Sequence, residues 1–214
     1  MSINGGAPLE LCEVNNFRGG TWGEDGTIIF GLGFAAPLYR VSDAGGVTEA
    51  ITALEEGERS HRWPDFLPGT KAVLMTVQTS PSFEDARIEA VTLSDGQRKV
   101  IYQGGYSARY VPTGHLVFLH EGTLFGAPFD PDRLELLGQP APVLEDVLGN
   151  AFNRGSGEFA FSRQGSLIYQ TGTLTQFSRS LVWVDREGSI TPWETEAADY
   201  FGLRFSPDGR RLAR

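Results

Sequence analysis

Residues 205–209 read FSPDG, an aromatic residue followed by a polar turn built on proline and glycine. Similar segments, each led by an aromatic residue, occur four times upstream: WGEDG at 22–26, FLPGT at 66–70, YVPTG at 110–114 and FSRQG at 161–165. The leading aromatic residues are separated by 44, 44, 51 and 44 residues. Self-similarity at a fixed period indicates a repeat architecture.

Short apolar segments rich in β-forming residues follow each turn in the same order, so each unit is predicted to contain four strands. The first strand ends at the aromatic residue. Second strands are predicted at 27–30, 71–75, 115–119, 166–170 and 210–213, third strands at 37–41, 87–93, 123–129 and 180–185, and fourth strands at 47–52, 98–103, 141–145 and 189–193. Residues 48–60, TEAITALEEGERS, are the best helix candidate, but Gly57 interrupts them and VTEAIT also fits a strand.

A four-stranded antiparallel unit of about 44 residues has the size of a propeller blade. We therefore predict an all-β fold, a single β-propeller over 1–214 in which the repeated aromatic residues Trp22, Phe66, Tyr110, Phe161 and Phe205 fill the space between blades. The extra residues of the third unit are expected in an insertion at 130–140. Complete blades are predicted at 17–54, 61–104, 106–147 and 157–195, with an incomplete blade at 201–214 and the last strand of a preceding blade at 5–14.

The partial blades predicted at both ends leave two alternatives. The sequence favours a fragment of a larger propeller. In the other interpretation, the strand at 5–14 joins the strands of 201–214 and closes a five-bladed ring, which would remove unpaired strand edges.

Composition argues against several kinds of partner. The chain has 18 Lys and Arg against 27 Asp and Glu, a formal net charge of −9, and its densest basic cluster is Arg210, Arg211 and Arg214. Nucleic acid is therefore not expected as a partner. We find no apolar run long enough to span a bilayer, so this segment is predicted to be soluble and not to insert into a membrane. The compartment stays open, and either face of a bacterial membrane protein is compatible with the sequence.

The sequence shows no active site. His115 and His120 lie five positions apart on one predicted strand and point to opposite faces, so they do not form a metal site. The glycines beside Ser156 do not form a nucleophile elbow. We therefore predict no catalytic residue, no metal and no cofactor, and a chain that is not an enzyme. His61, Arg62 and Arg109 are the candidate interaction-surface residues, for a protein or small-ligand partner at a propeller rim.

The turn followed by an apolar strand and LYRV resembles the TolB-like and WD40-like propeller repeat. Three longer stretches, at 60–75, 121–143 and 180–188, are similar to the C-terminal propeller of bacterial eukaryotic-type serine/threonine protein kinases. One departure is LPGT at 67–70, where the family has LPDG, so we expect a tighter or shifted hairpin there. The kinase motifs are absent from this chain.

This resemblance implies a non-catalytic sensor or protein-interaction module, with the kinase domain outside this chain. Two alternatives stay open. One is a TolB-like scaffold of the cell envelope. The other is the gating propeller of a prolyl-oligopeptidase-type hydrolase.

Overall fold

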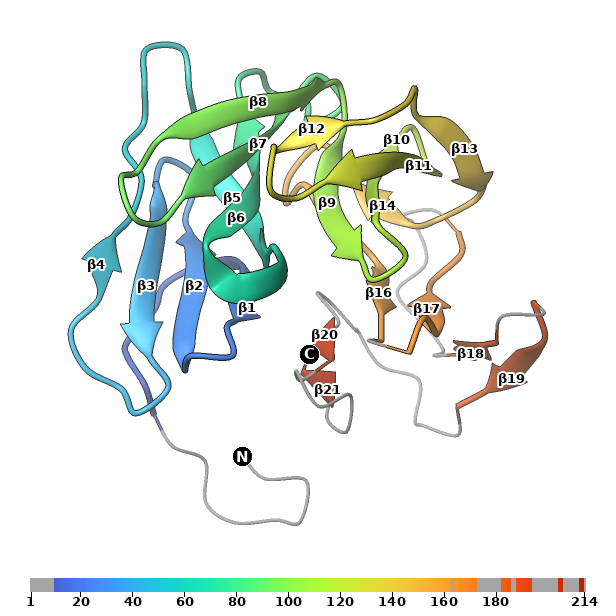
Figure 1. The fold of residues 1–214 in the computed structure, drawn as a ribbon, viewed down its shortest axis with the longest axis horizontal. Helices are drawn as coiled ribbons and strands as arrows, with labels where there is room; N and C mark the ends of the chain where they lie inside the picture. The colour runs from blue at the N-terminus through green and yellow to red at the C-terminus, as the bar shows by residue number, and fades with distance from the viewer. Residues whose placement is uncertain are drawn as a thin grey trace.

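The computed structural model describes residues 10–162, 164–172, 182–185, 188–193, 204–205 and 212–213. Four of the antiparallel sheets in this part of the chain fan around a common centre as the blades of a β-propeller, and two further sheets have two strands each (Figure 1). The first strand of each sheet lies nearest the centre and the last strand lies at the rim. The prediction of an all-β propeller with four-stranded antiparallel blades is therefore confirmed.

The first two sheets are simple meanders. The first contains β1 (Phe17–Trp22), β2 (Thr27–Leu32), β3 (Leu38–Ser42) and β4 (Glu49–Ala50). The second contains β5 (Ser60–Phe66), β6 (Ala72–Gln78), β7 (Arg87–Thr92) and β8 (Arg98–Gln103). Between β5 and β6 lies the short 3-10 helix η1 (Pro68–Thr70).

The third and fourth sheets follow the same plan with additions. The third contains β9 (Tyr106–Val111), β10 (His115–His120), β11 (Thr123–Asp130) and β13 (Ala141–Leu144), while β12 (Glu135–Leu136) pairs with the end of β11. The fourth contains β16 (Phe159–Phe161), β17 (Leu167–Tyr169), β18 (Val182–Val184) and β19 (Ile190–Pro192). The hairpin β14 (Gly149–Asn150) and β15 (Ser156–Gly157) precedes the fourth sheet, and β20 (Arg204–Phe205) pairs with β21 (Leu212–Ala213) beside β16.

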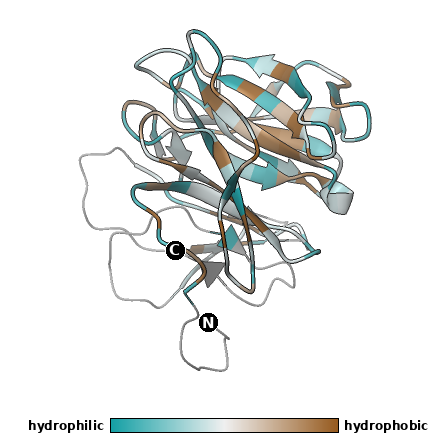
Figure 2. Ribbon diagram, turned by 90° about the vertical axis from the view of Figure 1, so that its left-hand side faces the viewer, coloured by the Kyte–Doolittle hydropathy of each residue, from teal (hydrophilic) through white to brown (hydrophobic). Residues whose placement is uncertain are grey.

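The apolar core lies between neighbouring blades, as the repeat predicts. One cluster joins Ile29 and Leu38 of the first blade to strands β6 and β7 of the second. The next cluster joins the second and third blades, and a further one joins the third blade to Phe159 of the fourth. Figure 2 shows apolar residues along the strands and hydrophilic residues in many of the loops.

The repeated aromatic residues occupy these interfaces with one exception. Phe66, Tyr110 and Phe161 are partly buried against the three clusters. Trp22 is 42% exposed because, among the described residues, no blade covers that side of the first sheet. The side chain of Phe205 lies outside the described part of the chain.

The innermost strands of the first three blades share a backbone irregularity with the same 44-residue period. Gly19, Trp63 and Ser107 have φ values of 87°, 51° and 55°, and each lies where the pairing with the second strand changes register. Glycine is required at the first position because a Cβ on Gly19 would lie 2.4 Å from Cε3 of Trp63. This contact sets how closely the first two innermost strands approach.

The sequence predictions for three individual segments had different outcomes. The insertion at 130–140 forms the extra strand β12, and the LPGT turn becomes η1, with left-handed backbone at Gly69 and Thr70. Of the two alternatives for 48–60, the strand forms and the helix does not: β4 ends at Ala50, and the following residues form a connector bound to the second blade.

The strand predicted at 5–14 is not observed in its described half. Residues 10–14 contain no strand, and Leu11 contributes only its carbonyl oxygen, which accepts a hydrogen bond from Gly46 N at 3.2 Å. Residues 5–9 lie outside the described part. The five-bladed alternative requires this segment to pair with the C-terminal strands, whereas among the described residues β20 and β21 pair only with each other.

Candidate functional site at the hub

His61, the first predicted site residue, is fully buried and belongs to a polar network away from the hub. Its Nδ1 lies 2.8 Å from Thr52 Oγ1, and its Nε2 lies 2.9 Å from Glu58 Oε2. Because Thr52 Oγ1 already accepts a hydrogen bond from Leu38 N, its hydroxyl is available to donate to Nδ1. The contacts therefore fit a neutral His61 whose Nε2–H donates to Glu58.

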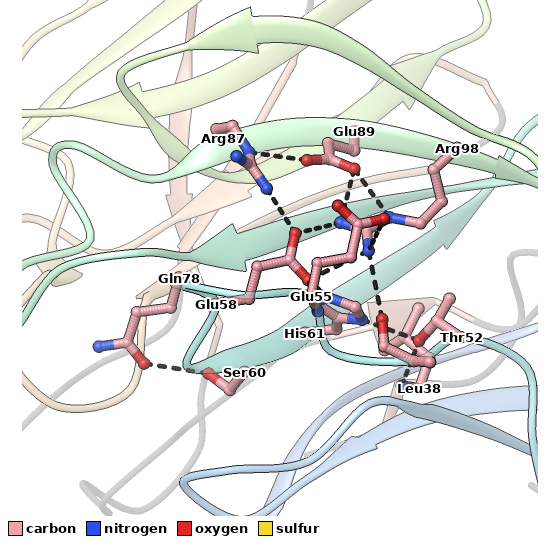
Figure 3. Close-up of polar contacts among 11 residues, drawn as sticks. Leu38, Thr52, Glu55, Glu58, Ser60, His61, Gln78, Arg87, Glu89 and Arg98 are labelled. Atoms are coloured by element: carbon pink, nitrogen blue, oxygen red, sulfur yellow. Dashed lines mark hydrogen bonds and ion pairs between the residues drawn. The ribbon is translucent and has the colours of Figure 1, made fainter.

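The same network fastens the connector between the first and second blades (Figure 3). Glu58, with 1% of its side chain exposed, forms ion pairs with Arg87 of β7 and Arg98 of β8. Both arginines also bind Glu89, at 2.8 Å and 2.9 Å. Residues 53–59 are thereby bound to the outer strands of the second blade.

The titration behaviour of this network indicates a structural role. Hydrogen bonds from Arg98, Glu55 N and His61 outweigh burial and lower the pKa of Glu58 to about 2. Burial lowers the pKa of His61 and keeps it neutral. A carboxylate whose oxygens are occupied by several donors is poorly placed for proton transfer.

Arg62, the second predicted residue, follows His61 on β5 but contacts a different set of groups, mostly in loops. It is 1% exposed, and its guanidinium carbon lies 4.8 Å from the Phe83 ring centre and 5.8 Å from that of Phe34. Its Nη1 donates to the carbonyl oxygens of Asn153 and Arg154, at 2.8 Å and 3.2 Å. Loops of the first and second blades and the loop of the β14–β15 hairpin thus meet around one side chain.

Arg18 completes this group, which we call the mouth cluster: Arg18, Phe34, Arg62, Phe83 and Arg154. The position of Arg18 in β1 corresponds to that of Arg62 in β5, 44 residues later. Its guanidinium carbon lies 4.9 Å from the Phe34 ring centre. Although Arg18 is only 6% exposed, no ion pair reaches it within the described ranges, and its Nε has no hydrogen-bond partner there.

The mouth cluster is electrostatically positive in a chain whose net charge is −9. Burial and then Arg154 lower the pKa of Arg18. Burial, followed by Arg18 and Arg59, lowers the pKa of Arg62 to about 10. Arg18 and Arg62 are like charges held close together, and neither forms an ion pair in the described part of the chain, an arrangement that favours an anion. The sequence predicted a basic cluster only at 210–214, whose side chains lie outside the described part of the chain. The mouth cluster was not predicted, because folding brings its arginines together from separate blades.

Arg109, the third predicted residue, lies on β9 and is also buried, with 5% exposure. Its Nη1 donates to the carbonyl oxygens of Ala108 and Trp63, and its Nε lies 3.9 Å from Asp65 Oδ1. Burial raises the pKa of Asp65 to about 6, more than Arg109 lowers it. His61, Arg62 and Arg109 are therefore not exposed surface residues: all three lie buried on innermost strands, and His61 faces the connector.

Other candidate chemistry is not assembled into a site in the described part of the chain. No group of three or more His, Cys, Asp and Glu side chains there could hold a metal ion. His115 and His120 lie at opposite ends of β10, beside Thr113 and Glu84 respectively. No helix among the described residues has the length and apolar character needed to span a membrane.

Comparison with solved structures places this geometry in the β-propeller class. A protein described as a gluconolactonase matches with a TM-score of 0.64 and 14% identity, over 92% of this chain and 69% of that one. A luciferin-regenerating enzyme matches with 0.63 and 11%, over 94% and 70%. A protein described as TolB, from Agrobacterium tumefaciens, matches with 0.60 and 13%, over 86% and 68%. No family model and no curated protein matches the sequence.

These likenesses support the TolB-like propeller but give no support to the resemblance to a kinase propeller. They also contradict the prediction that the chain is not an enzyme, because the gluconolactonase and the luciferin-regenerating enzyme carry their activities on this fold. The absence of a recognisable catalytic motif is therefore no argument against catalysis here. At these identities the likeness shows the fold alone and assigns no reaction.

Proposed function

We propose that this propeller binds a small anionic ligand at the mouth cluster. The observation that carries the proposal is Arg18, a buried guanidinium stacked on Phe34 with no acidic partner among the described residues. A buried charge is costly unless it is paired. Arg62 and Arg154 add positive charge, so a carboxylate, phosphate or sulfate group would be stabilised by several cations at once.

Phe34 supports a binding role because it is 60% exposed while two guanidinium groups lie on its ring. A ligand at this place would contact an apolar ring as well as the cations. Loops from different blades supply these groups, an arrangement typical of binding sites built on a rigid scaffold.

Thermal unfolding with Arg18→Met tests the proposal. Phosphate, sulfate and citrate are added in turn at constant ionic strength. We expect at least one of these anions to raise the Tm of the natural chain, with an effect that saturates as its concentration increases. Arg18→Met should remove this rise while raising the Tm of the ligand-free protein, because an unpaired buried charge is lost. Arg133→Gln, at an exposed position, is the matched control. An equal anion effect in Arg18→Met, or none in the natural chain, would contradict the proposal.

For the parent protein, we propose a bacterial serine/threonine kinase in which this propeller senses the ligand. The support is the resemblance of 60–75, 121–143 and 180–188 to the propellers of such kinases. The adjoining coding sequence tests this: a kinase domain upstream supports it, and a peptidase domain or an envelope-export signal argues for one of the alternatives.

A catalytic propeller is a second candidate, favoured by the enzymes that share the fold. In that case the mouth cluster would hold the anionic group of a substrate. Turnover of sugar-acid lactones by the purified chain, lost in Arg18→Met, would support it, whereas anion binding without turnover of these substrates would count against it.

A further inference from the structure

The mouth cluster holds two neighbouring side chains that each lack a partner of the right kind. Arg18 is a cation with 6% exposure, it forms no ion pair, and its Nε has no hydrogen-bond partner in the described part of the chain. Phe34, whose ring centre lies 4.9 Å from the guanidinium carbon of Arg18, is 60% exposed. A single exposed aromatic residue is ordinary on a protein surface. Here, however, the exposed ring lies against a buried cation without a counter-charge, so one ligand can satisfy both groups.

The backbone on either side of Phe34 is anchored to innermost strands and their approaches. Gly33 N donates a hydrogen bond to the carbonyl oxygen of Asn16 at 2.9 Å, and His61 N donates one to the carbonyl oxygen of Ala36 at 3.0 Å. The loop 33–37 is therefore held to both the first and the second blade. A ring that is positioned before a ligand binds costs little ordering entropy in the complex.

The second arginine of the mouth cluster has less capacity left for a direct contact. Arg62 donates through Nε to Ser60 Oγ at 2.8 Å, and through Nη1 to the carbonyl oxygens of Asn153 and Arg154. Two of its three nitrogen atoms are thus occupied. Arg62 therefore contributes mainly attraction at a distance, whereas Arg18 can contact an anion directly. One available guanidinium matches one carboxylate, which favours a ligand with a single charged group.

The separation of Arg18 and Phe34 determines which part of such a ligand meets the ring. Charge-assisted hydrogen bonds to a guanidinium are about 2.7–2.9 Å long. With the guanidinium carbon only 4.9 Å from the ring centre, an apolar body attached directly to the anionic group can reach Phe34. Aromatic rings pack with their centres about 4.5–7 Å apart, and this separation allows such a contact.

We propose that the mouth cluster selects an anion whose charged group is attached directly to a flat apolar body, as in an aromatic carboxylate. Arg18 binds the carboxylate, and Phe34 packs against the body and determines specificity. This inference rests on the proposed anion site and narrows the class of ligand that the site takes.

NMR titration with benzoate, acetate and benzyl alcohol separates the charge from the apolar body. The backbone amide signals of residues 33–37 report binding at neutral pH and constant ionic strength. We expect benzoate to bind the natural chain about tenfold more tightly than acetate, because it adds a ring contact, and benzyl alcohol to cause no saturable shift.

Three variants assign these effects to particular side chains. Phe34→Ala should lower the benzoate affinity to that of acetate and leave the acetate affinity within about twofold, since only the ring contact is lost. Arg18→Met should remove the binding of both carboxylates. Val143→Ala, which shortens an exposed apolar side chain of β13, is the matched control and should change neither affinity. If Phe34→Ala does not fold, Phe34→Leu keeps an apolar side chain without the ring and should still reduce the preference for benzoate.

The outcomes separate this inference from the proposed function. Equal affinities for benzoate and acetate, both lost in Arg18→Met, would leave the anion site in place and overturn the specificity. A preference for benzoate that persists in Phe34→Ala would overturn the role of the ring, and equal binding of benzyl alcohol would overturn the role of the charge. If neither carboxylate binds, the inference is wrong, and the proposed function fails as well only if phosphate, sulfate and citrate also have no effect.

Discussion

Replacing Glu58 with Gln should destabilise the protein strongly, although Glu58 lies in a connector with no regular structure. The carboxylate holds Arg87, Arg98 and His61, and its side chain is 1% exposed. Its pKa falls from the ordinary 4.5 to about 2. At about 1.4 kcal/mol per pKa unit, this difference corresponds to about 3 kcal/mol of stability at neutral pH.

A loss of this size agrees with the cost of breaking a buried ion pair, about 3–5 kcal/mol, because the arginines lose a partner while Arg98 stays 12% exposed. For a chain of this length it corresponds to a Tm decrease of roughly 6–12 °C. Urea unfolding of the natural chain and of Glu58→Gln measures the difference. The matched control is Glu49→Gln, which breaks an exposed ion pair with Arg40 and should cost less than about 1 kcal/mol.

The pH dependence of this contribution has a definite sign. Glu58 has a depressed pKa in the folded state, so its stabilisation is fully present above a pH of 4.5 and is lost as the pH falls toward about 2. The natural chain and Glu58→Gln should therefore converge in stability across this window. A variant within about 0.5 kcal/mol of the natural chain at neutral pH, or a difference that does not shrink in acid, would show that the network does not hold the connector.

Three further predictions concern packing and the hub, each measured by chemical or thermal unfolding. Gly19→Ala should cost about 2 kcal/mol or more, since it adds left-handed strain and a 2.4 Å contact, whereas Gly96→Ala, also left-handed but in open space, should cost about 1 kcal/mol. Phe118→Ala, which empties a buried site beside Tyr102 and Phe125, should cost about 3–5 kcal/mol, against less than about 0.5 kcal/mol for the exposed Phe152→Ala. Asp65→Asn should raise the Tm by up to roughly 6–12 °C at neutral pH, because burial raises the pKa of Asp65 from 3.8 to about 6, which corresponds to about 3 kcal/mol, and this gain should vanish as the pH falls below 3.8, where Asp65 is protonated in both states. Comparable costs at Gly19 and Gly96, a mild effect of Phe118→Ala, or an Asp65→Asn gain that persists in acid would each contradict the corresponding argument.

Most of the fold could be predicted from local sequence because a repeat multiplies weak signals. A single aromatic residue before a polar turn, such as Phe66, indicates little, but five at regular intervals fix the period and the order of strands. The insertion at 130–140 was also predictable, since it alone lengthens the interval to 51 residues. By contrast, the sequence left 48–60 open between a helix and a strand, because the conformation of the connector at 51–59 depends on Arg87 and Arg98, which lie about 30 and 40 residues away.

The candidate site was only partly predictable for the same physical reason. Arg62 and Arg109 were singled out, but as surface residues, and alternation along a short strand does not reveal that a neighbouring blade buries them. Arg18 was missed although the repeat held a signal: Arg18 and Arg62 are 44 residues apart, so both belong to the same place in successive blades. Comparing chemistry at equivalent positions, rather than searching for motifs, would have found it.

Comparing residues at equivalent positions of successive blades also explains why polar residues lie on the innermost strands of an otherwise apolar fold. Neighbouring blades need apolar contacts along most of their faces, and the three interface clusters supply them. Innermost strands, however, converge with amide groups that no partner strand of their own sheet satisfies, as at Phe66 N and Tyr110 N, where Thr21 and Asp65 provide the acceptors. At Arg109 the equivalent position holds a donor instead, and its guanidinium turns back to the carbonyl oxygen of Trp63 and to Asp65, both on β5, so the two arms of this contact still join neighbouring innermost strands.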